Sequence, residues 1–385
     1  MNRLIIIGNG FDLAHGLKTS YKDFINWYWE QRIDDLVSNH TTELKDCLCT
    51  IYITKESGYS SWSSFASKNF HFKIFYNKKN TGLDFFQFIK EKRVYFTIKY
   101  THIFERITNS IETKGWVDIE VEYYELLKKY SDNIEKCKEL NEQLDFLREK
   151  LSQYLNSLPK CKRNNRIFNL MTDIFDPADF AISSYKKTIE TICGYYKELN
   201  IESIRHNTKE LPNWIPRQIM LLSFNYTKTV ELYNNHNISY NYIHGELSKP
   251  DEIIFGYGDE LDKNYNDLRD KNENELLRYI KSVKYLETGH YRDMLSFIES
   301  APFQVFIMGH SCGNSDRTLL NTVFEHENCV SIKPFYYVKP DGTDTYLELV
   351  QNISRNFTNP KLFRDRVVYK ELCQELPQCP KDTNE

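Results

Sequence analysis

The sequence predicts an α/β protein: a Rossmann-like, doubly wound and mostly parallel sheet with a large helical insertion. Three short apolar runs predict this class, at Leu4–Ile7, Ile219–Leu222 and Phe303–Met308. Each run ends in polar or glycine-rich residues, which is typical of strands buried on both faces of a parallel sheet. Ligands of such sheets bind outside the carboxyl ends of the strands, so we expect a site where these runs end.

A further pair of runs, Tyr240–Ile243 and Ile253–Phe255, is separated by Pro250-Asp251. We expect two strands joined by a turn at this proline. The first of them ends in His244-Gly245 and the second in Gly256.

Residues 26–215 are expected to form the insertion. Its segments Asp118–Tyr130 and Ile134–Leu158 carry apolar residues three and four positions apart, as amphipathic helices do. The predicted organisation is therefore a discontinuous nucleotide-binding core at 1–25 and 216–375, a mostly helical insertion at 26–215, and a flexible tail at 376–385.

Composition narrows the classes of function. The 385 residues carry a formal net charge of −4, so nucleic acid is not indicated as a partner. The chain contains no apolar run of the roughly 18–20 residues that a membrane helix needs, and its N-terminal run is too short for a secretion signal, so we expect a cytoplasmic protein. The nine cysteines include no Cys-x-x-Cys pair, which predicts reduced thiols and no bound metal. Phe and Tyr cluster between 65 and 130, where they predict an aromatic core, with base stacking as the alternative.

The turn Gly8-Asn9-Gly10 follows the first strand directly. Two glycines permit a tight turn and a close approach of a ligand to the backbone. A helix starting there would direct its free N–H groups at a phosphate. The alternative is a tight strand-to-helix connection without a ligand, since the third glycine of the dinucleotide fingerprint is missing.

Two polar residues follow other strands. Asn225, in Ser223-Phe224-Asn225-Tyr226, either caps a helix or orients a water or a ribose hydroxyl with its amide. His244 is either a structural hydrogen-bonding residue or a general base, and Gly245 beside it would allow a ligand to approach closely.

The loop after the third run, Gly309 to Asp316, is small and polar. Its backbone N–H groups are expected to contact phosphate or ribose oxygens, and Asp316 is expected to accept from a ribose hydroxyl. Alternatively, Asn314, Ser315 or Asp316 caps a following helix. Cys312 has no basic neighbour in sequence and is not assigned as a nucleophile.

Asp118 and Glu120 lie two apart where a helix is predicted to begin. Acidic residues stabilise a helix N-terminus, which is the simpler interpretation. Paired carboxylates would also serve a metal-dependent nuclease, and this stays a third hypothesis for function.

With these residues in place, the chain resembles the AbiH-type bacteriophage abortive-infection proteins. The resemblance rests on the long block from Leu4 to Phe24, on Trp116-x-Asp118-x-Glu120, on the stretch from Ser223 to Thr227, on His244-Gly245 and on Gly309-His310-Ser311. It implies an effector of phage defence. Such an activity must be restrained, so we expect the insertion to mediate homo-oligomerisation or contact with an accessory defence partner.

The order of these motifs also resembles that of sirtuin-like domains, several of which destroy NAD during phage infection. This resemblance implies that Asn225 and His244 carry the chemistry at the nicotinamide ribose. It implies cofactor-binding roles for Gly8, Asn9, Gly10, Asp12, Gly245, Gly309, Ser311 and Asp316. The turn differs from the usual Gly-Ala-Gly-x-Ser, and the four-cysteine zinc module of the deacylases is absent.

The resulting hypothesis is hydrolysis of NAD, as substrate, to ADP-ribose and nicotinamide. His244 would act as general base toward a ribose hydroxyl or water, and Asn225 would orient the water at the anomeric carbon. The alternative is a nucleotide-sensing protein without turnover.

Overall fold

The structure is a computed structural model and describes residues 1–77, 81–92 and 95–379. The chain forms two compact units. The sheet unit comprises Met1–Lys18, Leu158–Lys271 and the chain from Tyr279 onward, and the helical unit comprises Thr19–Ser157 and Asn272–Arg278. Residues 158–215 thus pack with the sheet unit, although they were expected in the insertion. Compactness does not test which segments bind a ligand, so the division into functional domains stays a prediction.

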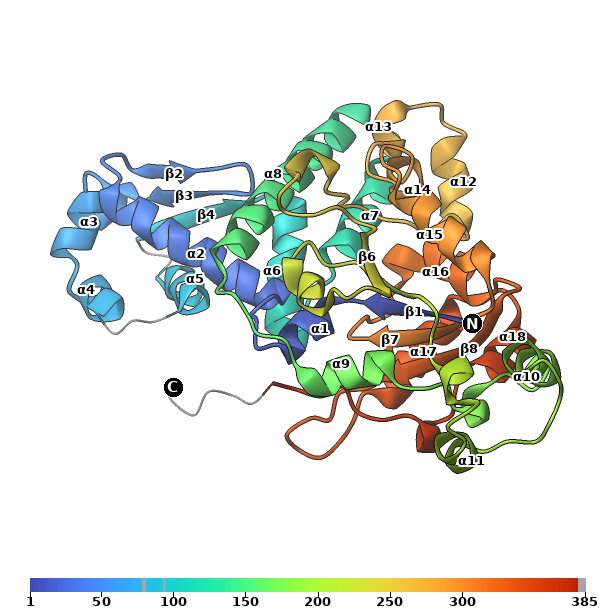
Figure 1. Cartoon of the computed structure of the whole chain (residues 1–385). Coiled ribbons are helices and arrows are strands. Elements are labelled where there is room, and N and C mark those ends of the chain that lie inside the picture. Colours follow the sequence, from blue (N-terminus) through green and yellow to red (C-terminus); the bar gives the residue numbers. More distant parts are fainter. Residues whose placement is uncertain (78–80, 93–94, 380–385) are drawn as a thin grey trace. The chain divides into compact units, whose positions relative to one another are not determined.

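The sheet unit is built on five parallel strands in the order β6-β5-β1-β7-β8, which confirms the predicted α/β class (Figure 1). The strands are β1 (Asn2–Ile7), β5 (Ile219–Ser223), β6 (Ile238–Tyr242), β7 (Phe303–Met308) and β8 (Cys329–Phe335). Renumbered by their sequence order within this sheet, the strands run 3-2-1-4-5, which is a Rossmann-type order. The strand order therefore reverses between β1 and β7, where ligands of such sheets bind.

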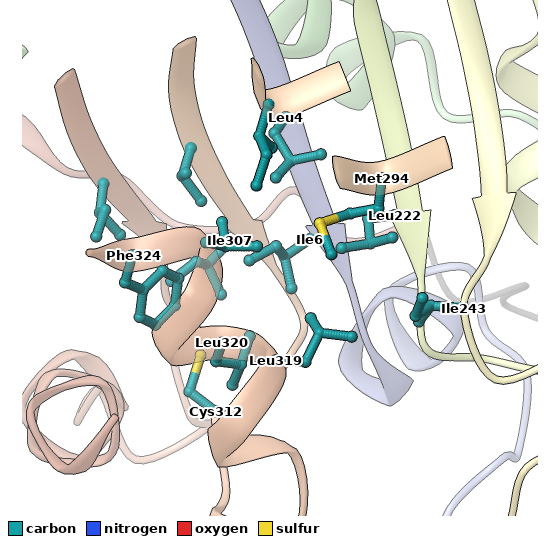
Figure 2. Packing of buried hydrophobic residues seen from close by; sticks show 14 of the residues in the cluster. Leu4, Ile6, Leu222, Ile243, Met294, Ile307, Cys312, Leu319, Leu320 and Phe324 are labelled. Atoms are coloured by element: carbon teal, nitrogen blue, oxygen red, sulfur yellow. The ribbon is translucent and has the colours of Figure 1, made fainter. Parts of the chain in front are cut away.

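Alternating side chains of β1 pack against opposite faces of the sheet. Leu4 and Ile6 belong to a core with α15 (His290–Ser300), α16 (Arg317–Phe324) and α17 (Tyr346–Arg355). Figure 2 shows Leu4 and Ile6 among Leu222, Met294, Ile307 and Leu319 of this core. Ile5 and Ile7 pack on the other face, with α1 (Asn9–Ala14), α9 (Asn165–Thr172) and the 3₁₀ turn η4 (Lys228–Tyr233). Helices on both faces make the sheet doubly wound, as the apolar runs predicted.

A third core of the sheet unit joins the amino-terminal end of the sheet to residues 174–214. Met1 and Val330 pack there with Phe175, Ile189 and Trp214. The other helices and 3₁₀ turns of this unit are η2 (Pro177–Asp179), α10 (Tyr185–Cys193), α11 (Ile201–His206), η3 (Leu211–Trp214), η5 (Pro250–Glu252), α12 (Lys263–Arg269), α14 (Lys281–Lys284), η6 (Asn314–Asp316), α18 (Pro360–Arg366) and η7 (Lys370–Leu372).

The prediction of a strand at Ile253–Phe255 is wrong. Within the described residues this segment belongs to no strand. A single backbone hydrogen bond, from the Ile254 N–H to the His244 carbonyl at 2.9 Å, links it to the residues after β6. The 3₁₀ turn at Pro250–Glu252 directly precedes this segment, and the Gly245 Cα lies against the Glu252 backbone. Strand β8 was not predicted, because Pro334 and Lys333 break its apolar pattern; proline is tolerated there because β8 is the last strand of the sheet.

The helical unit contains both predicted helices. They are α7 (Ile119–Tyr130) and α8 (Ile134–Ser157), and the side chain of Asp118 caps α7 by accepting from the Val121 N–H. The unit also holds an antiparallel sheet in the order β2-β3-β4, which was not predicted within a mostly helical insertion. Its other elements are α2 (Tyr21–Ser38), β2 (Glu43–Lys45), β3 (Cys49–Ile53), η1 (Lys55–Ser57), α3 (Trp62–Lys68), α4 (Phe70–Asn77), α5 (Gly82–Glu91), β4 (Phe96–Tyr100), α6 (His102–Lys114) and α13 (Asn274–Leu277).

Aromatic residues build the core of the helical unit, although Phe70 and Tyr76 of the predicted aromatic cluster are exposed. Trp29 stacks on Phe86 with ring centroids 4.9 Å apart, and Trp62 stacks on Phe96 at 5.2 Å. All four rings are buried, so they pack with one another and do not offer faces for base stacking. Across residues 1–77, 81–92 and 95–379, no cysteine pair forms a disulfide and no helix is long and apolar enough to cross a membrane.

Candidate functional site

The carboxyl ends of four neighbouring strands place polar residues at one edge of the sheet. β1 leads into the Gly8 turn, β5 into Phe224-Asn225, β6 into His244 and β7 into Gly309-His310. Parallel pairing brings these ends together, because Ile7 is paired with both Ser223 and Met308. The predicted convergence is therefore present in the backbone, and the side chains fall into two groups.

The first group surrounds Asn225 and Asp12. The Asn225 amide donates to the Gly8 carbonyl at 3.0 Å, and so ties the end of β5 to the turn after β1. Asp12, on α1, accepts from the Thr227 hydroxyl at 2.6 Å. Asn225 caps no helix, so the simpler interpretation of this residue is replaced by a bridge between two loops.

Asp12 is nearly inaccessible, and its two carboxylate oxygens differ. Oδ2 is bound by Thr227, whereas Oδ1 is buried without a hydrogen-bond partner among the described residues. Burial raises the pKa of Asp12 to about 6, against the opposing effect of polar neighbours Thr227, Thr229 and Asn225.

The second group is centred on the Asp316 carboxylate. Its Oδ1 accepts from the Lys281 ammonium at 2.7 Å and lies 3.3 Å from His244 Nε2, while Oδ2 lies 3.6 Å from His310 Nε2. The Tyr285 hydroxyl lies 3.2 Å from His244 Nε2. We call Lys281, Asp316, His244 and His310 the Asp316 cluster; all four side chains are buried.

Burial and mutual charge set the protonation states in the Asp316 cluster. Burial first, and the Lys281 charge second, lower the pKa of His244 to about 4, so this imidazole is neutral at neutral pH. Burial by itself would raise the pKa of Asp316. The positive charge of Lys281 opposes this effect and holds that pKa well below its usual range. The cluster therefore contains one compensated ion pair and a neutral His244.

The ring orientation of His310 is fixed from the other side. Its Nδ1 accepts from the Cys312 N–H at 2.9 Å, so its Nε2 carries the proton that faces Asp316. Phe224 packs against both histidines of the Asp316 cluster, with ring centroids 5.0 Å from His244 and 4.2 Å from His310. Cys312 itself lies in the apolar core beside Leu319 and Leu320 (Figure 2), and burial raises the pKa of its thiol beyond the range of a nucleophile.

The glycines at this edge pack against neighbouring backbone. A Cβ on Gly8 would lie 2.5 Å from His310 Cα, and one on Gly309, whose φ is +76°, would lie 2.0 Å from the Phe11 nitrogen. The Gly10 N–H donates to the Gly309 carbonyl at 2.8 Å. Gly245, with φ +82°, similarly lies against Glu252. The close approach of neighbouring backbone is enough to explain why glycine occurs at these positions. Contact of these glycines with a phosphate stays a prediction.

Two other predicted site residues, Asn9 and Ser311, are exposed, and the Ser311 carbonyl accepts from the Asn352 amide. Asp316 occupies the N-cap position of α16, where the alternative interpretation placed a capping residue. Its side chain caps no N–H group of that helix and pairs with Lys281 instead.

Three residues of the site were missed by sequence reasoning: Lys281, Tyr285 and a role for His310. His310 had a usable signal, since it follows a predicted strand in the same manner as His244. Lys281 and Tyr285 come from α14 and its end, in a segment without a motif. A bridge of Tyr257 to Ile280 holds that segment, with the Lys281 N–H donating to the Tyr257 carbonyl.

Within the ranges that the structure describes, no group of three or more His, Cys, Asp or Glu side chains has the arrangement of a metal site. One carboxylate oxygen of Asp118 accepts from the Val121 N–H at the N-terminus of α7, and Glu120 is buried in the first turn of that helix. The capping contact gives Asp118 a structural role, and the nuclease hypothesis for Asp118 and Glu120 stays a prediction.

Fold and site together define a Rossmann-type α/β protein with buried ionisable groups at the carboxyl edge of its sheet. The chain belongs to the bacteriophage abortive infection AbiH family, whose model matches residues 4–338. None of the curated protein sequences compared with the chain matches it. Family membership assigns the protein a role in abortive infection by phage, as its motifs predicted.

Proposed function

We propose that the protein hydrolyses NAD to ADP-ribose and nicotinamide during phage infection. The observation that supports the proposal is that buried polar residues follow neighbouring strands at the carboxyl edge of a Rossmann-type sheet: Asn225 after β5, His244 after β6, and Asp12 on α1 after β1. Buried polar groups at that edge are typical of sites that orient a nucleotide and a water.

The chemistry makes modest demands on the protein. The nicotinamide ring of NAD carries a positive charge, so it leaves as a neutral group while an oxocarbenium-like ribose forms. The protein must hold the ribose, position one water and stabilise positive charge. The amide of Asn225 suits the water, and neutral His244, oriented by Asp316, suits a hydrogen bond to a ribose hydroxyl.

The role of the helical unit belongs to the same proposal. We assign to it the contact that restrains or triggers the activity, with a second copy of the chain or an accessory defence partner. Large apolar side chains exposed on this unit, Phe70 and Trp116 among them, support such a contact. Sedimentation of the purified protein, with and without NAD, tests whether copies associate.

The decisive experiment follows nicotinamide release from NAD by the purified chain and by two variants. Asn225→Ala and His244→Ala are each expected to lower the rate by about 100-fold or more, as losses of positioned polar groups do. His236→Ala is the matched control, because His236 is exposed at the opposite end of the strand that carries His244. NAD that is bound but recovered intact would support the sensing alternative, and no binding would contradict both.

A further inference from the structure

Asp12 has an oxygen that no feature of the fold explains. The side chain is more than nine-tenths buried, Oδ2 is held by Thr227, and Oδ1 has no hydrogen-bond partner among the described residues. A buried carboxylate oxygen without a partner is costly and calls for an explanation, such as a catalytic role or a bound water. The side chains of Thr229 and Asn225 lie close enough to the Asp12 carboxylate to lower its pKa, but they do not satisfy Oδ1.

Packing alone does not require a carboxylate at this position. The Thr227 hydroxyl needs an acceptor, which an asparagine amide would supply without a buried charge. Asp12 makes no side-chain cap on α1. The negative charge and the unpartnered oxygen therefore call for a chemical explanation.

The alternative proton acceptor, His244, is poorly placed for that task. Its Nε2 faces Asp316 and Tyr285, and its pKa of about 4 makes it a weak base. The pKa of Asp12, about 6, is closer to neutrality, where a general base is most effective. Asn225, the group proposed to orient water, is a polar neighbour of Asp12.

We propose that Asp12 is the general base that takes a proton from the attacking water, with Oδ1 as the accepting atom. The assignment rests on the proposed NAD hydrolysis. In the step, the bond from the ribose anomeric carbon to the nicotinamide nitrogen breaks, and its electron pair leaves with nicotinamide. The water oxygen bonds to the anomeric carbon, its proton passes to Asp12, and Asp12 later releases that proton to solvent.

The surroundings of Asp12 determine the pH dependence of this step. Thr227, Thr229 and Asn225, which precede or lie in η4, are neutral and favour the ionised carboxylate. Cys161, from the segment before α9, is a titratable group that interacts electrostatically with Asp12, and burial raises the pKa of its thiol. Cys161 is therefore uncharged while Asp12 titrates.

The test measures nicotinamide release from NAD between pH 4.5 and 8.5. The wild-type rate is expected to rise with pH and to level off above about pH 6. Asp12→Asn is expected to lower kcat by about 100-fold or more, to abolish this rise and to leave the Kd for NAD within threefold. Asp341→Asn, in an exposed turn, serves as the matched control and should leave rate and pH profile unchanged.

A second variant, Thr227→Val, tests the role of Asp12 even if Asp12→Asn fails to fold. Thr227→Val removes the hydroxyl that favours the ionised Asp12, so the rise is expected to shift to higher pH with a similar plateau. A wild type that hydrolyses NAD while Asp12→Asn keeps its rate, or while Thr227→Val shows no shift, overturns the role of Asp12 and leaves the proposed function standing. A wild type that releases no nicotinamide overturns both.

Discussion

At the scale of single residues, burial and Lys281 together keep His244 neutral. Both side chains approach Asp316 Oδ1, at 2.7 and 3.3 Å, and the lysine is the closer cation. A proton on His244 would be shielded from water, which is the larger cause of the lowered pKa, and it would also be repelled by Lys281. The imidazole is therefore neutral and available as a hydrogen-bonding group.

Lys281→Met is therefore expected to raise the pKa of His244 by about one unit, since one of the charges that oppose its proton is removed while Asp316 still attracts it. Loss of a buried partner should also destabilise the fold, by about 3 kcal/mol. Imidazole NMR shifts recorded against pH at low temperature give the pKa. Lys284→Met, which removes a lysine paired with Glu287 on the same helix, is the control. An unchanged His244 pKa would contradict the assignment.

His244 and Asp12 give the stability of the fold opposite dependences on pH. His244 has a folded-state pKa of about 4, below its usual 6.5, so the folded state binds fewer protons between these values and stability falls as pH drops through them. Asp12 has a raised pKa of about 6, so its folded state binds more protons and stability falls as pH rises from about 4 to 6.

Asp12→Asn is accordingly expected to gain stability over the wild type as pH rises from 4 to 7, by up to about 3 kcal/mol for two pKa units. Urea unfolding of both proteins at several pH values measures the difference, in which the contribution of His244 cancels. A difference that is constant with pH would show that Asp12 is not shifted.

Sequence reasoning found Asn225, His244 and Asp316, which lie at or shortly after the ends of apolar runs, and it missed Lys281 and Tyr285. Asn225 and His244 follow apolar runs, so parallel pairing placed them at one edge. Lys281 approaches Asp316 from an irregular segment that is held by a bridge and hydrogen bonds at Tyr257. A lysine in an exposed-looking sequence carries no pattern that predicts burial, and such long-range contacts are set by tertiary packing.

At the scale of elements, the loops after β1 and β7 depend on glycine for their contact. Gly309 has φ +76°, and its Cα faces the backbone of Phe11. Gly342 has a similar φ of +83° but nothing within 4 Å of an added Cβ. The two positions therefore separate the cost of left-handed backbone from the cost of a steric clash.

Gly342→Ala is expected to lose about 1 kcal/mol of unfolding free energy, through strain alone. Gly309→Ala should lose several times as much, because its Cβ would meet backbone atoms that cannot move without separating β1 from β7. Chemical denaturation of both variants measures the contrast. Equal losses would mean that the two loops part easily, as loops that open for a ligand would.

Element prediction succeeded for the inner strands and for edge strand β6 (Ile238–Tyr242), expected at Tyr240–Ile243, and it failed for edge strand β8. Strands β1, β5 and β7 are nearly all apolar, and they lie inside the sheet. Edge strand β8 contains Lys333 and Pro334, and Ile253–Phe255 is apolar without being a strand. In both cases, whether the segment forms a strand depends on which other segments lie beside it. The periodicity of the sequence does not encode that position.

At the scale of the whole molecule, the chain passes between two units that each have their own core. Leu222 lies in a core of the sheet unit and Leu147, on α8, is buried in the helical unit. Separate cores permit separate unfolding, because a cavity in one core removes contacts from that unit only.

Leu222→Ala and Leu147→Ala are each expected to lose about 2–5 kcal/mol, confined to their own unit. Hydrogen exchange followed by mass spectrometry reads this locally: Leu222→Ala should speed exchange in β1, β5 and β7, and Leu147→Ala in α7 and α8. NAD, if bound as proposed, should slow exchange at the ends of β1, β5 and β6 in the wild type. Faster exchange in both units of either variant would show one cooperative molecule. In one cooperative molecule, a partner bound to the helical unit would act on the proposed NAD site through the stability of the whole chain. If the two units unfold independently, a partner could control that site only through a direct structural contact.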